Sequence, residues 1–333
     1  MDLFSNLFSI TIIQNFKYVK NIYFAENLPG DFMIKLTPSL FDFDCKKNYP
    51  QIEKFIASEM QEMGRSGIVI PISGGLDSSV VAALCANAVG KDKVIGLLLP
   101  EKKGNPDALR FAHLLARHLG IKTVTIDISR ILKPLGTYRF FANRFSRSSQ
   151  KAFVSRLSPE VTRSLFYSIL DGNSKPIVRQ GMASMASKHR TRFVVAYKYA
   201  EDQNLMEVGC AHKSEDQLGL FSKFGVDDNA DVMPLKNLYR TQILQIARYL
   251  KIPPEIIERS PNPDMLPGID DKYLDVLGVE SGVIDLILYG LEQNMSSSEI
   301  AKQLGLKTEK VNEIKGLVKA TTHMRNHSLS PVF

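Results

Sequence analysis

Hydrophobic positions in the first half of the chain switch repeatedly between helical and strand-like spacing. The helical spacing covers residues 51–62, 78–89 and 106–119, and short apolar, β-branched runs cover residues 67–72, 94–99 and 123–128. Strands that are separated by single helices imply right-handed crossovers and a parallel sheet that is covered on both faces. The pattern therefore predicts an α/β domain with a doubly wound parallel sheet.

The rest of the chain is predicted to be mainly helical. We expect helices broken at Pro159 and near Gly172, a helix at 187–202, a strand at 205–209, a mostly irregular stretch at 229–268 around one helix at 241–250, and a helical tail at 283–321. Within that tail, residues 296–311 resemble a helix-turn-helix. Glu309 and Glu313 stand among the lysines of its second helix, which makes a poor face for DNA phosphates, so DNA binding is not expected.

Composition narrows the class of protein. The chain has 333 residues, 44% of them hydrophobic, which is enough for a substantial core and excludes a disordered chain. Its three cysteines are far apart and form no CxxC pair, which favours a reducing compartment and argues against a structural zinc site. Residues 1–25 lack the features of a signal peptide or a membrane span. We therefore expect a cytoplasmic protein with no membrane partner, for which Met33 is an alternative start.

The net charge of +7 is unevenly distributed along the chain. Residues 130–198 contain fourteen Lys and Arg against the two acids Glu160 and Asp171, so this segment carries +12 and the remaining 264 residues about −5. A basic segment of this kind indicates an anionic partner.

A glycine-rich turn lies between the first predicted strand and its helix. Its sequence is Ser73-Gly-Gly-Leu-Asp-Ser-Ser79. The carboxyl end of a parallel strand is where ligands bind, and the following helix offers unpaired N–H groups and the positive end of its dipole. Gly74 and Gly75 allow the main chain to curl around an anion, and Ser73 and Ser78 add hydroxyl donors. The turn lacks the lysine of GxxxxGK[ST] and carries Asp77, a carboxylate suited to hold Mg²⁺.

The SGGxDS pattern resembles the phosphate loop of the N-type ATP pyrophosphatases, and the second half of the chain is similar to the NAD synthetase family among them. The matching runs are 208–215, 219–225, 231–235, 239–242, 261–264, 270–278, 299–305 and 323–325, and the similarity covers about residues 41–331. The resemblance implies an adenine nucleotide alpha hydrolase-like, Rossmann-like fold with a helical C-terminal extension. It also implies a ligase that adenylates the carboxylate of deamido-NAD with ATP and Mg²⁺ and then aminates it with ammonia, which gives NAD, AMP and pyrophosphate.

Residue roles follow from the resemblance by motif position. It implies Asp77 and Glu215 as metal ligands and Asp77 and Lys223 as catalytic residues. The implied nucleotide-binding residues are Ser73, Gly74, Gly75, Asp77, Ser78, Ser79, Cys210, Arg240, Asn262, Arg190, Lys223, Asp231 and His323.

Several positions depart from the family's pattern, mainly on the side of the acceptor substrate. Met185-Ala186, Cys210, Asn262 and Met324 stand where the family has other hydrogen-bonding groups or a glycine. ATP activation is therefore the firmer expectation, and the acceptor stays open. A ligase of the same fold that acts on another carboxylate and a tRNA-modifying ATP pyrophosphatase are the alternatives.

Some residues are expected to have ordinary structural roles. Cys210 is predicted to be a small hydrophobic residue rather than a nucleophile. His113, His118 and His212 show no metal-ligand spacing, so each is expected to be hydrogen-bonded or exposed.

The chain is expected to divide into an N-terminal extension of unknown role at 1–40 and a synthetase-like domain at 41–333. Within the domain, 130–185 is a basic insert or lid and 283–333 is the helical C-terminal part. Glutamine-dependent members of the family carry an amidase domain ahead of the synthetase. Since only the 1–40 segment precedes the domain here, free ammonia or a separate glutaminase subunit is the expected nitrogen source. The resemblance also implies a homodimer.

Overall fold

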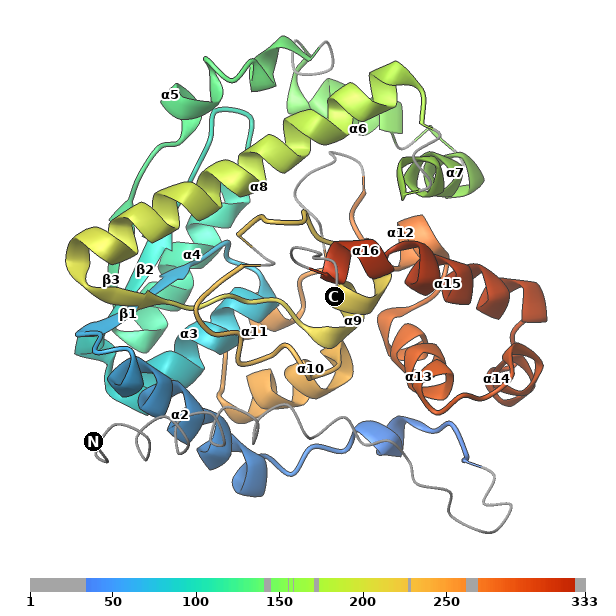
Figure 1. Ribbon diagram of the computed structural model, residues 1–333, viewed down its shortest axis with the longest axis horizontal. Coiled ribbons are helices and arrows are strands. Elements are labelled where there is room, and N and C mark those ends of the chain that lie inside the picture. The colour runs from blue at the N-terminus through green and yellow to red at the C-terminus, as the bar shows by residue number, and fades with distance from the viewer. Residues whose placement is uncertain are drawn as a thin grey trace, which may run out of the picture. The chain divides into compact units, whose positions relative to one another are not determined.

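A four-stranded parallel sheet forms the centre of the domain in the computed structural model, in the order β3-β2-β1-β4 (Figure 1). The structure describes residues 34–140, 145–154, 156–157, 159–170, 174–226, 229–261 and 269–326. The strands are β1 (Gly67–Pro71), β2 (Val94–Leu98), β3 (Lys122–Thr125) and β4 (Leu205–Glu207), and their register pairs Ile70 with Gly96 and Val69 with Glu207. The predicted parallel α/β sheet is confirmed.

Helices make up most of the remaining described chain. They are η1 (Pro38–Phe41), α2 (Cys45–Glu62), α3 (Leu76–Val89), η2 (Lys91–Lys93), α4 (Pro106–Leu119), α5 (Ser129–Leu132), η3 (Thr137–Arg139), α6 (Arg147–Val154), α7 (Pro159–Leu170), α8 (Pro176–Gln203), α9 (Lys213–Leu218), α10 (Arg240–Tyr249), α11 (Pro254–Ile257), α12 (Leu274–Leu277), α13 (Ser281–Glu292), α14 (Ser297–Leu304), α15 (Thr308–Ala320) and α16 (Thr322–Arg325). Among the described residues, no helix is both long enough and apolar enough to cross a membrane.

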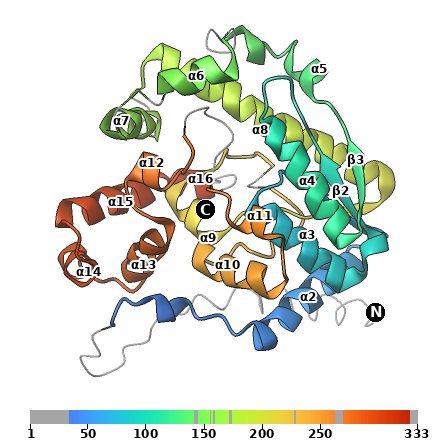
Figure 2. The same cartoon turned by 180° about the vertical axis from the view of Figure 1, so that it is seen from behind.

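Alternating side chains of the strands form cores on both faces of the sheet. Ile68 and Ile70 point to one face, where they pack with buried residues of α3, α4 and α10. Val69 points to the other face and packs with residues of α5 and α8, which include Val195. The two faces are visible in Figures 1 and 2, which show α8 in front of the sheet in one view and behind it in the other. This two-sided burial explains why the strands read as continuous apolar runs.

Most element boundaries agree with the sequence pattern, and the clearest differences concern two helices. The helix expected from residue 187 begins at Pro176 and runs without a break to Gln203. The helix expected from residue 78 begins at Leu76, so Asp77 and Ser78 both lie in its first turn. The small helix α11 falls in the stretch expected to be irregular.

The strand order places the glycine-rich turn at a change of direction in the sheet. From β1 the chain moves outward through β2 and β3, and it then crosses to the opposite side of β1 to form β4. In open α/β sheets, ligands bind beyond the carboxyl ends of the strands, at the position where the strand order changes direction. The glycine-rich turn after β1 lies at this position.

Gly74, within this turn, lies against the helix α4. Its φ angle is +74°, and a Cβ atom there would lie 2.6 Å from the carbonyl oxygen of Ala108 and 2.8 Å from the Cβ of Phe111. A side chain would therefore be strained and would also collide with the α4 backbone.

Gly74→Ala is expected to lower the free energy of unfolding by about 2–4 kcal/mol, because it adds a backbone clash to the cost of a positive φ. Gly64→Ala is the matched control, since Gly64 has a φ of +64° and open space around it, and its cost should be about 1 kcal/mol. Urea unfolding of both variants measures the difference. Equal losses would show that α4 does not constrain the turn.

Candidate functional site

The turn between β1 and α3 is held by its own hydroxyl groups. The Ser79 hydroxyl donates to the carbonyl of Gly75 at 2.7 Å, and the Ser73 and Ser78 hydroxyl oxygens lie 3.2 Å apart. Gly75 is the N-cap residue of α3, and no side chain caps the helix. The first-turn N–H groups and the positive end of the helix dipole are thus left for an anion.

A cavity of about 410 Å³ opens in front of this turn, a size typical of small-molecule sites. It is lined by residues from the turn, from the ends of β2 and β4, and from α8, α9 and α10. The lining includes Ser73, Gly75, Asp77, Ser78, Leu99, Glu101, Lys102, Asn105, Lys188, His189, Arg192, Cys210, Glu215, Arg240, Arg259, Ser260 and Lys272. Segments that lie far apart in the sequence therefore meet at the carboxyl edge of the sheet.

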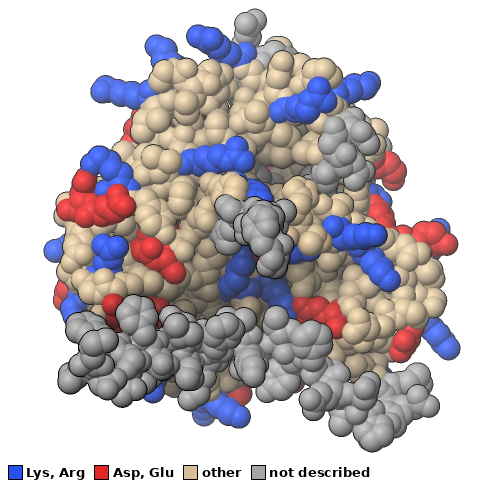
Figure 3. All heavy atoms as spheres, viewed as in Figure 1, with Lys and Arg blue, Asp and Glu red and all other residues tan. Residues whose placement is uncertain are grey.

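The cavity has a positive balance of charge. Of the described residues, six Lys and Arg line it against the three acids Asp77, Glu101 and Glu215. Figure 3 shows Lys and Arg, with hardly any Asp or Glu, over the upper part of the face on which α6 and α8 lie. A positively lined cavity concentrates anionic ligands.

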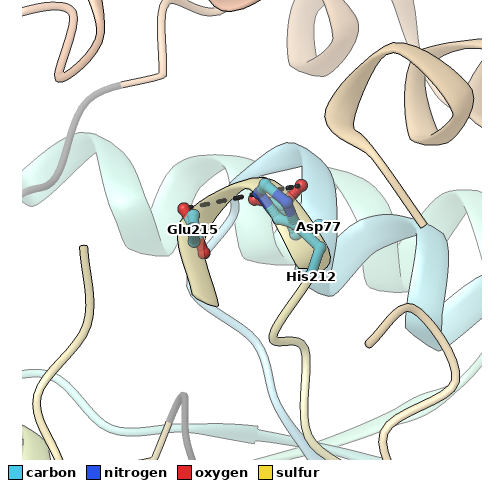
Figure 4. A group of neighbouring side chains, drawn as sticks. All are labelled: Asp77, His212 and Glu215. Carbon is cyan, nitrogen blue, oxygen red and sulfur yellow. Dashed lines mark ion pairs between the residues drawn. The ribbon is translucent and has the colours of Figure 1, made fainter. Parts of the chain in front are cut away.

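Asp77, His212 and Glu215 form a compact group, and the carboxylates of Asp77 and Glu215 also line the cavity (Figure 4). Their ligand atoms all lie within 4.8 Å of one another, and the His212 Nε2 atom is 3.5 Å from Glu215 Oε1 and 3.9 Å from Asp77 Oδ1. Asp77 Oδ1 and both ring nitrogens of His212 are buried and have no hydrogen-bond partner among the residues that the structure describes. Two carboxylates and an imidazole with unused lone pairs fit a divalent cation.

The ionisation states of this group suit a metal site. Burial lowers the pKa of His212 to about 4, against the opposing effect of Asp77, so the imidazole is neutral near pH 7. Burial alone would raise the pKa of Asp77, but His212, Arg240 and Lys272 outweigh it and hold that pKa below its usual value. Asp77 is therefore a carboxylate at neutral pH.

Two basic side chains reach the same carboxylates. The Arg240 Nη1 atom lies 3.6 Å from Asp77 Oδ1, and Lys272 forms an ion pair with Glu215. Arg240 and Lys272 are both almost fully buried. Burial lowers the pKa of Lys272 and Asp77 opposes this shift.

Arg240 is positioned by a buried polar network at the start of α10. Asp285 accepts hydrogen bonds from the Ser214 hydroxyl at 2.6 Å and from the N–H and hydroxyl of Thr241 at 2.8 and 2.6 Å. The Ser214 hydroxyl oxygen in turn accepts from the Arg240 N–H at 3.0 Å. This network ties α9, which carries Glu215, to α10 and α13.

Arg259 fixes the turn from the opposite side. Its Nη1 atom donates to the Gly74 carbonyl at 2.5 Å, and its guanidinium lies 4.2 Å from the centre of the Phe111 ring. The turn is therefore held between α4 and the segment that follows α11.

Lys188 and Glu101 form a second buried pair at the rim of the cavity. The Lys188 Nζ atom lies 2.6 Å from Glu101 Oε1, while Glu101 Oε2 accepts from the Lys103 N–H and the Tyr138 hydroxyl, both at 2.8 Å. Burial raises the pKa of Glu101, but the contacts with Lys188, Lys103 and Tyr138 outweigh it and leave that pKa below its ordinary value. The pair links β2 to α8.

The structure brings about half of the sequence-predicted residues to the cavity. Those that line it are Ser73, Gly75, Asp77, Ser78, Cys210, Glu215 and Arg240. Gly74 and Ser79 stand behind the turn and shape it, and Asn262 lies outside the described residues.

Three predicted residues form a separate group outside the cavity lining. The Arg190 guanidinium donates to the Lys223 carbonyl at 3.2 Å, and the Lys223 ammonium donates to the His323 carbonyl at 2.8 Å. Asp231 joins neither group: it accepts from the Tyr197 hydroxyl at 3.0 Å and from the Glu207 N–H at 2.9 Å, next to β4.

The expectation that His212 is hydrogen-bonded or exposed is wrong. It is fully buried, neither ring nitrogen has a hydrogen-bond partner within the described part of the chain, and it lies between Asp77 and Glu215. Its spacing of three residues from Glu215 was the available signal, since α9 brings i and i+3 side chains together. Lys272, Arg259 and Lys188 were also missed, because nothing local in the sequence distinguishes them from surface charges.

Comparison with known proteins agrees with the resemblance seen in the sequence. The family model for NAD synthase matches residues 48–157 and 146–328. The chain is 33% identical over 281 residues to the NH(3)-dependent NAD(+) synthetase of Methanocaldococcus jannaschii, covering 84% of this chain and 95% of that one. It is 32% identical to the protein of the same name from Coprothermobacter proteolyticus, covering 76% and 87%.

Solved structures show the same fold. NMN synthetase from Francisella tularensis aligns with a TM-score of 0.64 and 22% identity, covering 88% of this chain and 100% of that one. The NH3-dependent NAD synthetase from Campylobacter jejuni aligns with a TM-score of 0.61 and 22% identity, covering 87% and 100%. The expected adenine nucleotide alpha hydrolase-like fold is thereby confirmed.

Glu101→Gln is expected to lower the free energy of unfolding at pH 7 by about 2–4 kcal/mol, because it leaves the buried Lys188 without a counter-charge. The difference from wild type should shrink as the pH falls below about 4.5, since a group whose pKa is lowered on folding stabilises only while it is ionised. Urea unfolding between pH 7 and pH 4 measures it. Asp202→Asn, which breaks the exposed Lys198–Asp202 pair on α8, is the control and should cost below about 0.5 kcal/mol. A pH-independent difference would contradict an ionised Glu101.

Proposed function

The chain belongs to the NAD synthase family, and from that premise we propose that it is a carbon–nitrogen ligase that makes NAD from deamido-NAD, ATP and ammonia. The relatives from M. jannaschii and C. proteolyticus, over 30% identical along most of the chain, are NH(3)-dependent NAD(+) synthetases. The observation that carries the proposal is the pairing of Asp77, in the first turn of α3, with Glu215 inside a positively lined cavity.

The proposed reaction has two steps. An oxygen of the nicotinate carboxylate attacks the α-phosphorus of ATP, the bond to the bridging oxygen breaks, and pyrophosphate leaves. Ammonia then attacks the acyl carbon, loses a proton, and displaces AMP, which carries away the attacking oxygen. Neither step needs a nucleophile from the protein, which agrees with the role of Cys210 as part of the cavity wall.

The turn after β1 would bind the pyrophosphate end of ATP. Its open N–H groups and the hydroxyls of Ser73 and Ser78 supply donors, and Arg240 adds a positive charge from the other side. Donors that are already in place before the leaving group develops its charge need no reorganisation during the reaction. Gly74 and Arg259 keep the turn in this shape.

Asp77 and Glu215 would hold Mg²⁺, with His212 beside them. When bound, the ion would neutralise charge on the pyrophosphate leaving group. Magnesium ions in phosphate-transfer sites are commonly held by one or two carboxylates together with the substrate phosphates, and Asp77 and Glu215 supply two such carboxylates here.

Arg190, Lys223 and His323 would contact the dinucleotide outside the ATP cavity. The support is a chain of contacts between these residues. Arg190, on α8, donates to the main-chain carbonyl of Lys223, in the loop after α9, and the Lys223 ammonium donates to the carbonyl of His323. A group of cations separate from the phosphate loop suits a second, phosphate-bearing substrate.

We further propose a homodimer in the cytoplasm. Five large apolar side chains between residues 145 and 194 are exposed, namely Phe145, Val161, Leu165, Ile177 and Val194, and an interface between two copies would cover them. The cysteines Cys45, Cys85 and Cys210 are free, which fits a reducing compartment.

The alternatives drawn from the sequence are not favoured. The reported relatives that are over 30% identical are NAD synthetases named for ammonia, which supports neither a tRNA substrate nor a separate glutaminase subunit. The likeness to NMN synthetase is at 22% identity and concerns the fold alone.

Asp77→Asn is expected to reduce release of AMP and pyrophosphate by at least about a hundredfold, because the site loses a charged metal ligand. Asp216→Asn, which removes a carboxylate from the same helix as Glu215 but outside the cavity, should retain activity. Both variants are assayed with ATP, deamido-NAD and ammonium. Retained turnover in Asp77→Asn would refute the metal role of this residue.

Arg190→Gln is expected to raise KM for deamido-NAD roughly tenfold while KM for ATP stays within about twofold, because the lost charge faces only the dinucleotide. Lys198→Gln, which removes an exposed charge from the same helix, should change neither KM. Steady-state kinetics with each substrate varied in turn measure the split. An equal rise in both KM values would argue against a separate dinucleotide subsite.

A further inference from the structure

Lys272 lines the cavity, and it comes from a loop that is distant in sequence from Asp77, His212 and Glu215. Its loop directly precedes α12 and is fixed by several hydrogen bonds to the carboxylates of Asp271 and Asp275, at 2.8 to 2.9 Å. The following residue, Tyr273, is fully buried. The backbone that carries Lys272 is therefore fixed, and the Lys272 side chain is only 12% exposed.

The Lys272 ammonium contacts a carboxylate oxygen that the proposed metal site requires. It pairs with Glu215 Oε1, the same oxygen that lies 3.5 Å from His212 Nε2 within the Asp77, His212 and Glu215 group. A divalent cation bound between Asp77 and Glu215 would occupy the place that this ammonium takes. The two cations compete for one oxygen.

The charges of the group already balance without a metal ion. Asp77 and Glu215 contribute two negative charges, and the side chains that pair with them, Arg240 and Lys272, contribute two positive charges. A divalent cation added alone would leave a buried site with an excess of two positive charges, which is strongly unfavourable in a low-dielectric environment. ATP brings the negative charge that would compensate the ion, and its phosphates offer Lys272 and Arg240 new partners.

We infer that Lys272 is a resident counter-ion that holds Glu215 in the nucleotide-free protein and transfers to a nucleotide phosphate when ATP arrives, so that the metal ion enters with ATP and not before it. The inference rests on the metal site of the proposed function. It assigns to this lysine control over the order in which metal and nucleotide bind.

Direct measurement of metal affinity tests the inference without relying on catalysis. Mn²⁺ serves as the probe, and its free concentration is followed by electron paramagnetic resonance with the full chain, either alone or saturated with α,β-methylene ATP, which cannot be cleaved at the reacting bond. The proteins compared are wild type, Lys272→Gln and Lys236→Gln. Lys236 is the matched control because it pairs at 2.5 Å with Asp216, the neighbour of Glu215, and does not line the cavity.

Wild type and Lys236→Gln are expected to bind Mn²⁺ weakly alone and at least about tenfold more tightly with the nucleotide analogue. Lys272→Gln is expected to bind Mn²⁺ at least about tenfold more tightly than wild type when no nucleotide is present, because the competing charge is gone. Lys272→Arg, which keeps the charge, should behave like wild type. Thermal unfolding with and without Mn²⁺ provides a second readout, since tighter binding raises the melting temperature of the folded variant.

The outcomes separate this inference from the proposed function. Equal nucleotide-free affinity in wild type and Lys272→Gln would overturn the competition while leaving the metal site in place, and weaker binding in the variant would show that Lys272 supports the ion. Absence of Mn²⁺ binding in every protein, with or without the analogue, would overturn the metal site and the inference with it.

Discussion

Compensation of buried charge is the constraint on which the rest of this site depends. The side chains of Asp77 and Glu215 are only 21% and 13% exposed, and a carboxylate that is largely shielded from water stays ionised only when opposite charges lie against it. Arg240 and Lys272 supply those charges, and each comes from a different segment of the second half of the chain. The phosphate loop can therefore present a working carboxylate only after α10 and the loop before α12 have packed against α3. The site therefore becomes competent for catalysis only when the second half of the chain has folded.

The sheet order explains why these segments meet. Since β4 returns to the side of β1 that β2 does not occupy, the residues that follow it, His212 and Glu215 among them, arrive beside the turn after β1. Burial of both sheet faces fixes the register, and the Asp285 network then sets α9 against α10. Asp285 thus fixes the backbone of Arg240 through the Ser214 hydroxyl, although Asp285 does not itself line the cavity.

Much of this architecture could be predicted from the sequence, because the apolar spacing that determines β1, α3, β2 and α4 is local. The loop residues Ser73 to Asp77 could also be predicted, since a strand, two glycines and an N-terminal helical turn lie next to one another in the chain. Lys272 and Arg259 could not be predicted, because their role comes from contacts between segments far apart in the sequence. Arg259 contacts Gly74, 185 positions away, and Lys272 contacts Glu215, 57 positions away, and no local pattern encodes such a contact. The expectation for His212 was wrong for a related reason. Its i, i+3 spacing from Glu215 was visible in the sequence, but its contact with the distant Asp77 was not. Arg190 is a third case, since the motif singled it out although it lies beside Lys223 rather than in the cavity.

The central claim is that this site transfers an adenylyl group to the carboxylate of deamido-NAD before ammonia enters. Deamido-NAD labelled with ¹⁸O in the nicotinate carboxylate tests it most directly, with AMP and pyrophosphate analysed by mass spectrometry after one turnover with ATP and ammonium. Attack of the carboxylate on the α-phosphorus predicts one ¹⁸O atom in AMP and none in pyrophosphate. Unlabelled AMP, or label in the pyrophosphate, would contradict the account.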